Sequence, residues 1–91
     1  MTILERLKEI DREIERLDED RANLQKYWAE EIKAEMDKPK FDMYSRKGEK
    51  ALLKISNKYA PLFVDIDDKK DEFIEEYNYL VKRFENLEEN N

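Results

Sequence analysis

The sequence contains no cysteine and no histidine, and apart from its tyrosines it has only three hydroxyl side chains, Thr2, Ser45 and Ser56. Without cysteine the chain forms no disulfide and no thiolate metal site. Without a histidine or cysteine partner, the usual acyl-transfer triads are absent. Carboxylates are abundant, but a charged helix face carries many without any catalytic role. We therefore expect a protein that is not an enzyme and binds neither cofactor nor metal.

Glycine and proline are also scarce, with one Gly and two Pro in 91 residues, while 46% of the residues are charged and 40% are hydrophobic. This balance is typical of long amphipathic helices and not of a disordered chain. The longest run without a charge, residues 59–64, is too short for a transmembrane segment or a signal peptide. We expect a soluble, cytoplasmic protein with a single helical domain covering residues 1–91.

The first part of the chain has the spacing of a coiled-coil helix. Thr2 and Glu5 are placed as a capping box, so the helix should cover about residues 2–37. Its seam residues alternate in steps of four and three, with one polar member. They are Ile3, Leu7, Ile10, Ile14, Leu17, Arg21, Leu24 and Trp28. After Trp28 the apolar spacing lengthens to Ile32 and Met36, as in a straight helix.

The last part of the chain, about residues 66–89, repeats this seam, again with one polar member. Its seam residues are Phe63, Ile66, Lys70, Phe73, Tyr77, Leu80, Phe84 and Leu87. An antiparallel pairing places Ile10 opposite Leu80 and brings Arg21 and Lys70 into one layer. Such a shared polar layer fixes register, and acidic neighbours offset its charge. The pattern predicts an all-α fold based on an antiparallel coiled-coil helical hairpin.

Residues 46–59 suggest a short third helix. Ser45 is a suitable cap, and Ala60 with Pro61 is a stop signal. We expect this helix to pack at the closed end of the hairpin. The domain would then have a stalk, made of residues 1–30 and 68–91, and a three-helix head, made of residues 31–67.

Charge divides along the same boundary. The net charge is −4 over residues 1–36, +4 over 37–60 and −6 over 61–91, for a total of −6. This total disfavours wholesale binding to nucleic acid or to an anionic membrane, so we expect no membrane partner, and any basic surface is local. The basic and aromatic residues of the head loop 38–50 are Lys38, Lys40, Phe41, Tyr44, Arg46, Lys47 and Lys50.

This loop has two interpretations. As a binding site, its cations would contact a protein partner or the phosphates of a nucleic acid, with Phe41 or Tyr44 stacking on bases. Alternatively, Phe41, Met43 and Tyr44 plug the open end of the head while the charges are solvated.

A second surface is a stripe of Leu4, Ile74, Tyr79 and Val81 beside the seam. It suits either a homodimer, as when two hairpins form a four-helix bundle, or the capture of a partner helix. The leading hypothesis is a non-catalytic protein interaction module, either an adaptor or a stoichiometric inhibitor of a larger machine. Small size and high charge are also in keeping with a phage or mobile-element protein. The alternative is a nucleic-acid-associating protein that uses the basic loop.

Overall fold

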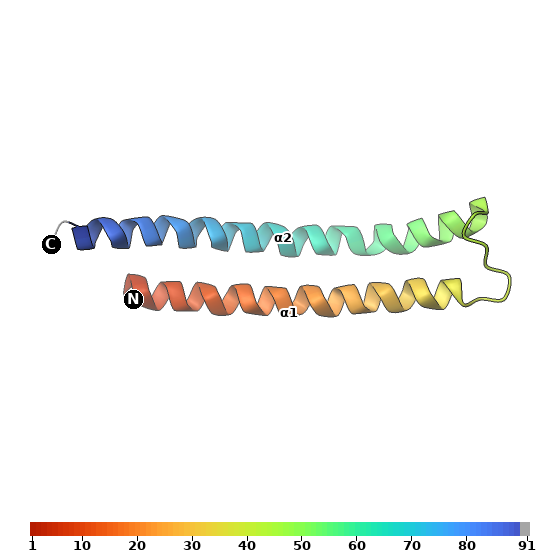
Figure 1. Cartoon of the computed structure of the whole chain (residues 1–91), viewed down its shortest axis with the longest axis horizontal. Coiled ribbons are helices and arrows are strands. Elements are labelled where there is room, and N and C mark those ends of the chain that lie inside the picture. The colour runs from red at the N-terminus through yellow and green to blue at the C-terminus, as the bar shows by residue number, and fades with distance from the viewer. Residues whose placement is uncertain (90–91) are drawn as a thin grey trace.

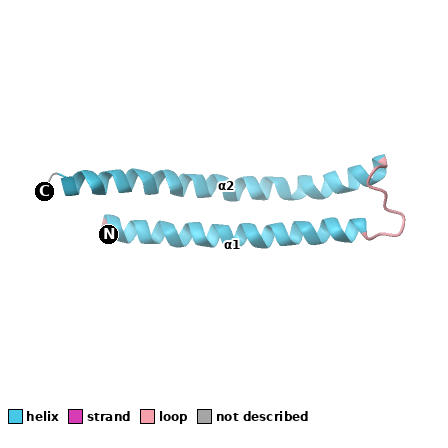
Figure 2. Cartoon of the chain, in the orientation of Figure 1, coloured by secondary structure: helices cyan, strands magenta, loops and turns pink. Residues whose placement is uncertain are grey.

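The structure, a computed structural model, describes the backbone of residues 1–89 and the side chains of residues 1–87. It contains two helices, α1 (Ile3–Met36) and α2 (Arg46–Glu89), joined by a loop of residues 37–45. The helices run antiparallel side by side, and α2 extends past the start of α1 (Figure 1). The hairpin is elongated, 70 Å by 18 Å by 15 Å. The described residues form helices and loop alone (Figure 2), which confirms the all-α helical hairpin.

The expected third helix is not a separate element, and that prediction is wrong. Residues 46–59 form the first part of α2, which continues through Pro61 to the end of the described chain (Figure 1). A proline inside a helix costs about 3 kcal/mol, because it removes the hydrogen bond to the carbonyl four residues earlier, here that of Asn57. Both Pro61 and Asn57 are exposed, so the proline lies on the side of α2 that does not pack against α1.

Packing explains why the helix continues. The four-three spacing of the second seam does not stop at Phe63 but extends backwards through Tyr59 and Ser56 to Leu52, across the proline. These positions are buried or half-buried against α1. The burial of one continuous seam offsets the local cost of Pro61. The three-helix head over residues 31–67 is therefore absent, and the hairpin simply continues to the loop.

The core is a single thin seam. Leu7, Ile10, Leu17 and Tyr59 are its buried apolar side chains among the described residues, and Ile10 alone is fully enclosed. On α1 half-buried Glu31 and Glu35 continue the four-three spacing, while Ile32 is also half-buried and Met36 is exposed. The expected lengthening of the apolar spacing therefore agrees with burial at Ile32 and is wrong at Met36.

Polar contacts between the helices report the register. Arg21 Nε lies 3.0 Å from an oxygen of Asp67, and Lys70 Nζ lies 2.7 Å from an oxygen of Asp18. Among the described residues three more pairs form hydrogen bonds across the helices. Arg6 donates to Glu76 through both Nε and Nη2, the latter at 2.7 Å, Trp28 Nε1 donates to Ser56 Oγ at 3.3 Å, and Lys58 Nζ donates to Glu31 Oε1 at 2.9 Å.

In an antiparallel pair the numbers of two residues in the same layer have a nearly constant sum, so this sum reports the register. It is between 82 and 89 for the observed contacts, whereas it is 90 or 91 for the expected layers. Helical side chains lean toward the N-terminus of their own helix. With that lean, the contacts indicate a register displaced by one layer, in which Lys70 lies level with Leu17 and not with Arg21. Leu87, the expected partner of Ile3, is accordingly 53% exposed.

Candidate functional site

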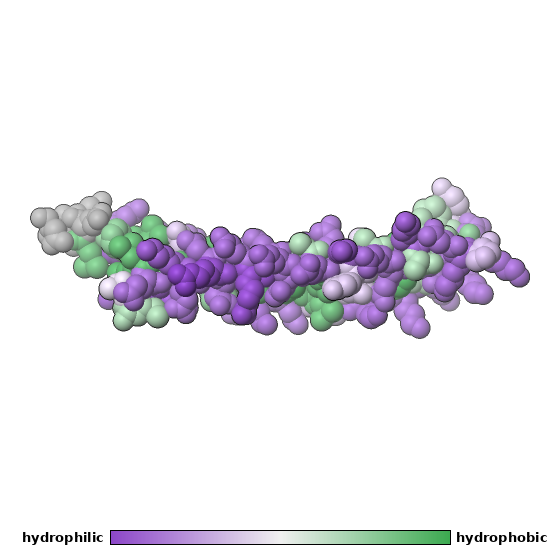
Figure 3. Space-filling view, turned by 90° about the horizontal axis from the view of Figure 1, so that it is seen from below, coloured by the Kyte–Doolittle hydropathy of each residue, from purple (hydrophilic) through white to green (hydrophobic). Residues whose placement is uncertain are grey.

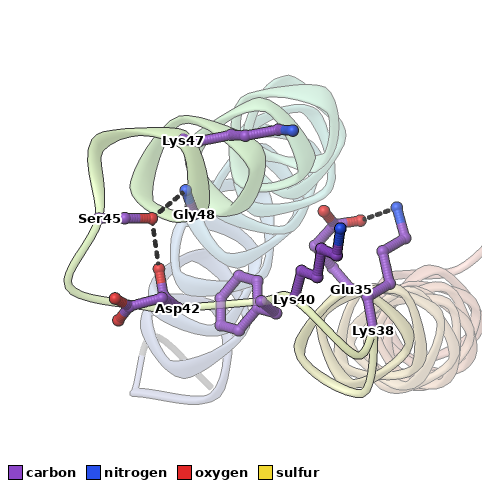
Figure 4. A pocket seen from close by; sticks show the side chains of 8 residues that line it. Glu35, Lys38, Lys40, Asp42, Ser45, Lys47 and Gly48 are labelled. Atoms are coloured by element: carbon purple, nitrogen blue, oxygen red, sulfur yellow. Dashed lines mark hydrogen bonds and ion pairs between the residues drawn. The ribbon is translucent and has the colours of Figure 1, made fainter.

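The loop between the helices is held by its own hydrogen bonds (Figure 4). The Asp42 carboxylate accepts from the Tyr44 backbone N–H at 2.9 Å. The Ser45 hydroxyl donates to the Asp42 carbonyl at 2.8 Å and accepts from the Gly48 N–H at 3.1 Å. The latter contact confirms Ser45 as the cap of α2, as the 3.1 Å contact from Glu5 N–H to Thr2 Oγ1 confirms Thr2 at α1.

The single glycine of the chain allows the loop to lie directly on the first turn of α2. Gly48 is buried, and a Cβ at this position would lie 2.0 Å from the Asp42 carbonyl oxygen and 3.3 Å from the Phe41 ring. No other residue fits without moving the loop backbone. The sequence offered a signal for this contact, a lone glycine at the start of a helical pattern, but not the identity of its neighbour.

The loop presents a fixed surface of cations around an aromatic side chain. Tyr44 is 92% exposed and Met43 is 49% exposed, so these two do not plug the end of the hairpin, and only Phe41 is half-buried. Lys40 and Lys47 line a shallow pocket of about 210 Å³ together with the Lys38–Glu35 ion pair, whose atoms are 2.7 Å apart. Arg46 and Lys50 are exposed on the first two turns of α2. The structure therefore gathers all seven predicted loop residues at one end of the hairpin.

A charged cluster that the sequence did not indicate lies two turns away. Lys58 donates to Glu31 Oε1 at 2.9 Å and lies 5.4 Å from the centre of the Tyr59 ring. The hydrogen bond with Lys58, and then the interaction with Tyr59, lower the pKa of Glu31. The Glu31 carboxylate in turn raises the pKa of both Lys58 and Tyr59. Glu31 Oε2 is buried without a hydrogen-bond partner in the described part of the chain, which is a cost that the contact of Oε1 with Lys58 partly offsets.

The predicted apolar stripe is only partly a single surface. Gln25 and Ala60 line one hollow, so their helical positions face the same side of the hairpin. Residues separated by multiples of seven lie on the same side of a helix with this repeat. Leu4 is 21 residues before Gln25, and Ile74 and Val81 are 14 and 21 residues after Ala60. These residues therefore share that side. Tyr79 does not, because it lies about 140° around α2 from Ile74.

The hollow itself was not predicted. It measures about 310 Å³ and is lined by Arg21, Gln25, Trp28, Ser56, Ala60 and Phe63. The hydrogen bond from Trp28 to Ser56 joins the two helices at its floor, and the Arg21 guanidinium lies 5.1 Å from the centre of the Phe63 ring. The hollow is therefore an aromatic concavity on the side that carries Leu4, Ile74 and Val81.

Among the side chains that the structure describes, residues 1–87, no three or more acidic, histidine or cysteine groups are placed to bind a metal ion. Neither helix has an apolar stretch of the length that crossing a bilayer requires, within the residues the structure describes. Comparison of the chain with models of protein families, with curated proteins and with solved structures finds no match.

Proposed function

We propose that this chain is a non-catalytic interaction module that binds a protein partner through the loop end of the hairpin, as an adaptor or a stoichiometric inhibitor. One observation supports this proposal above all: an almost fully exposed tyrosine stands on a loop that is fixed from both sides. Tyr44 is 92% exposed, while Asp42, Ser45 and Gly48 hold the backbone around it.

A preorganised aromatic side chain among cations is typical of a binding hot spot. Tyrosine and arginine are enriched where interfaces gain most of their affinity, and a loop that is already ordered loses little entropy on binding. The four exposed cations Lys40, Arg46, Lys47 and Lys50 lie within six residues of Tyr44 along the chain, in the loop and the first two turns of α2. Their charge favours a partner with an acidic surface.

The same loop supports a second candidate, single-stranded nucleic acid stacked on Tyr44. The protein partner is favoured because acidic residues interrupt the basic surface. Asp42 and Glu49 lie among the cations, and both helices carry net negative charge away from the loop. A phosphate backbone that extended beyond a few nucleotides would meet this negative charge.

The test is a charge reversal with a matched control. The loop variant K40E/R46E/K47E and the control K26E/K69E/K82E change the net charge equally, and all six positions are exposed on the hairpin. Quantitative pulldown from the cells that encode the protein should recover a partner with the wild type and the control, and at least tenfold less with the loop variant. Equal recovery by both variants would contradict a loop-based function.

Two further variants separate the role of loop shape from that of charge and from nucleic acid. Tyr44→Ala should weaken recovery of the partner without changing helicity, because this side chain supports nothing in the hairpin. Gly48→Ala should weaken recovery and increase tryptic cleavage after Lys40 and Lys47, because the new Cβ displaces the Asp42 carbonyl. A mobility shift with single-stranded RNA or DNA at low salt, lost in K40E/R46E/K47E alone, would favour the second candidate instead.

Self-association is also part of the proposal, and it concerns a different surface. The side of the hairpin that carries Leu4, Ile74 and Val81 lies along the helices, away from the loop, so the two contacts are compatible in one molecule.

A further inference from the structure

One side of the hairpin carries a ladder of paired residues at intervals of seven. Gln25 and Ala60 line the same hollow, and each step of seven along α1 matches a step of seven back along α2. We call this side the flank. Its five rungs are Leu4 with Val81, Asp11 with Ile74, Asp18 with Asp67, Gln25 with Ala60, and Ile32 with Leu53.

The ladder is nearly symmetric about its middle rung. Two apolar rungs lie at its ends, fourteen residues on either side of Asp18 on α1 and of Asp67 on α2. On one side of the middle rung, the next rung carries the large, exposed side chain of Ile74. On the other side, the next rung carries the small Ala60 and the hollow beside it. A surface whose two halves are complementary in this way fits a second copy of itself after a half turn.

The exposed area leaves room for such a contact. A compact monomer of 11.2 kDa exposes about 5,700 Å², whereas this chain exposes 7594 Å². The end rungs of the flank lie 28 residue steps apart, about 42 Å at 1.5 Å per residue, and the hairpin is 18 Å wide. Covering this face would bury about 750 Å² per copy, close to the size of a standard stable interface.

We propose that two copies associate face to face through the flank, with their loops at opposite ends, and that Ile74 of each copy enters the hollow of the other. The two-fold axis lies in the contact plane and runs along the middle rung, in the direction from Asp18 to Asp67. It places Ile74 level with the partner's Ala60, over the Trp28 and Phe63 side chains that line the hollow. It also places Leu4 level with the partner's Ile32, and Val81 level with the partner's Leu53. This dimer goes beyond the proposed loop function and does not depend on it.

Charge selects this orientation over the parallel one. The loop end, residues 37–60, carries a net charge of +4, while residues 1–36 and 61–91 carry −4 and −6. Opposite orientations place each loop end beside the acidic open end of the other copy, whereas parallel orientations would place the two basic ends together. Figure 3 shows apolar side chains gathered at the open end and a mostly hydrophilic surface along the rest of the side in view.

The middle rung is compatible with burial because its charges are compensated. Asp18 pairs with Lys70 at 2.7 Å and Asp67 pairs with Arg21 at 3.0 Å, so each copy brings two carboxylates and two cations to the axis. The layer is neutral in sum, because each carboxylate that meets its own copy at the axis is paired with a cation of its own chain. Polar layers of this kind fix alignment in helical assemblies.

Single-cysteine variants test the geometry directly, because the chain has no cysteine of its own. Asp18→Cys should give a disulfide-linked dimer on mild oxidation, because the two copies of this position meet at the axis. Leu4→Cys alone should not, but mixed with Ile32→Cys it should give a cross-linked pair. Cross-linking of Leu4→Cys with Val81→Cys on separate chains, without cross-linking of Asp18→Cys, would establish the parallel arrangement and overturn the proposal.

The second test is the mass in solution. Light scattering should give twice 11.2 kDa for the wild type, and half of that dimer mass for Ile74→Glu and for Ala60→Glu, which block the knob and the hollow. Tyr79→Glu is the matched control, since Tyr79 is 63% exposed on the opposite side, and it should remain a dimer. Circular dichroism checks that each variant is helical. A monomeric wild type, or a dimer unchanged by both flank variants, would overturn the proposal and leave the loop function untouched.

Discussion

Arg21 and Lys70, the one cation in each original seam, each form an ion pair with the acidic residue three positions before the other. Arg21 lies 3.0 Å from Asp67, and Lys70 lies 2.7 Å from Asp18. The side chains of all four residues are between a third and about half exposed, so each pair is partly solvated. Such pairs add little stability. Because each helix supplies the cation of one pair and the carboxylate of the other, the two pairs instead determine which layers of the helices are in contact.

Replacement of both cations by leucine should therefore stabilise the hairpin while it weakens the alignment. In R21L/K70L the seam gains two apolar side chains, and we expect the free energy of unfolding to rise by about 1 to 3 kcal/mol. Urea denaturation monitored by Trp28 fluorescence measures this change. The exposed control pair R12L/K69L should stay within about 0.5 kcal/mol of wild type. A clear loss of stability in R21L/K70L would show that the ion pairs hold the helices together.

The continuity of α2 gives a second prediction. Pro61→Ala restores a helical N–H toward the Asn57 carbonyl and removes the steric conflict of the ring. The free energy of unfolding should rise by about 1 to 3 kcal/mol, as measured by urea denaturation. Pro39→Ala, in the loop, should give no such gain. If Pro61 instead ended a helix, its replacement would leave stability unchanged or lower it, because a rigid turn residue would have been lost.

The sequence predicted the seams well, because each seam residue reports its own burial through spacing alone. Spacing alone could not decide whether the helix ends at Pro61 or continues through it. The local preference of proline favours a stop, whereas the seam residues Tyr59 and Phe63 favour continuation, and only their packing against α1 settles the competition. The register had a similar ambiguity, since two alignments that differ by one layer match apolar residues almost equally well.

The candidate surfaces were predicted less completely, for geometric reasons. Tyr79 was grouped with Ile74 and Val81 by proximity in sequence, but its angle around α2 places it on another side. The contact of Gly48 with the Asp42 carbonyl depends on the path of the loop. The hollow over Trp28 and Phe63 depends on which residues of the two helices meet. The spacing of residues within one helix specifies neither the path of the loop nor the contacts between the two helices.

The cluster at Glu31 predicts a loss of stability in acid. Lys58, and then Tyr59, lower the folded-state pKa of Glu31, and Arg6 lowers that of Glu76 in the same way. The unfolded chain therefore takes up protons first as the pH falls. The stabilisation is fully present above the ordinary glutamate pKa, about 4.3 to 4.5, and is lost as the pH falls through the lower folded values.

Urea midpoints measured at pH 7 and at successively lower pH should show this decline. In Glu31→Gln the decline below the ordinary glutamate pKa should be smaller, because one of the two shifted groups is gone. Glu15→Gln, at an exposed position of α1, is the control and should show the wild-type pH dependence. An identical decline in Glu31→Gln and in the wild type would show that Glu31 does not contribute to it.

The two ends of the seam should differ sharply in their sensitivity to truncation. Ile10 is 0% exposed and Leu87 is 53% exposed, although both occupy seam positions of the same heptad pattern. Ile10→Ala should lower the free energy of unfolding by about 2 to 4 kcal/mol, and Ile10→Val by about 1 kcal/mol if the alanine variant does not fold. Leu87→Ala should cost no more than about 0.5 kcal/mol. In the alternative alignment Leu87 packs on Ile3 and closes the seam, so a cost comparable to that of Ile10→Ala would show that the helices are displaced by one layer from the structure described here.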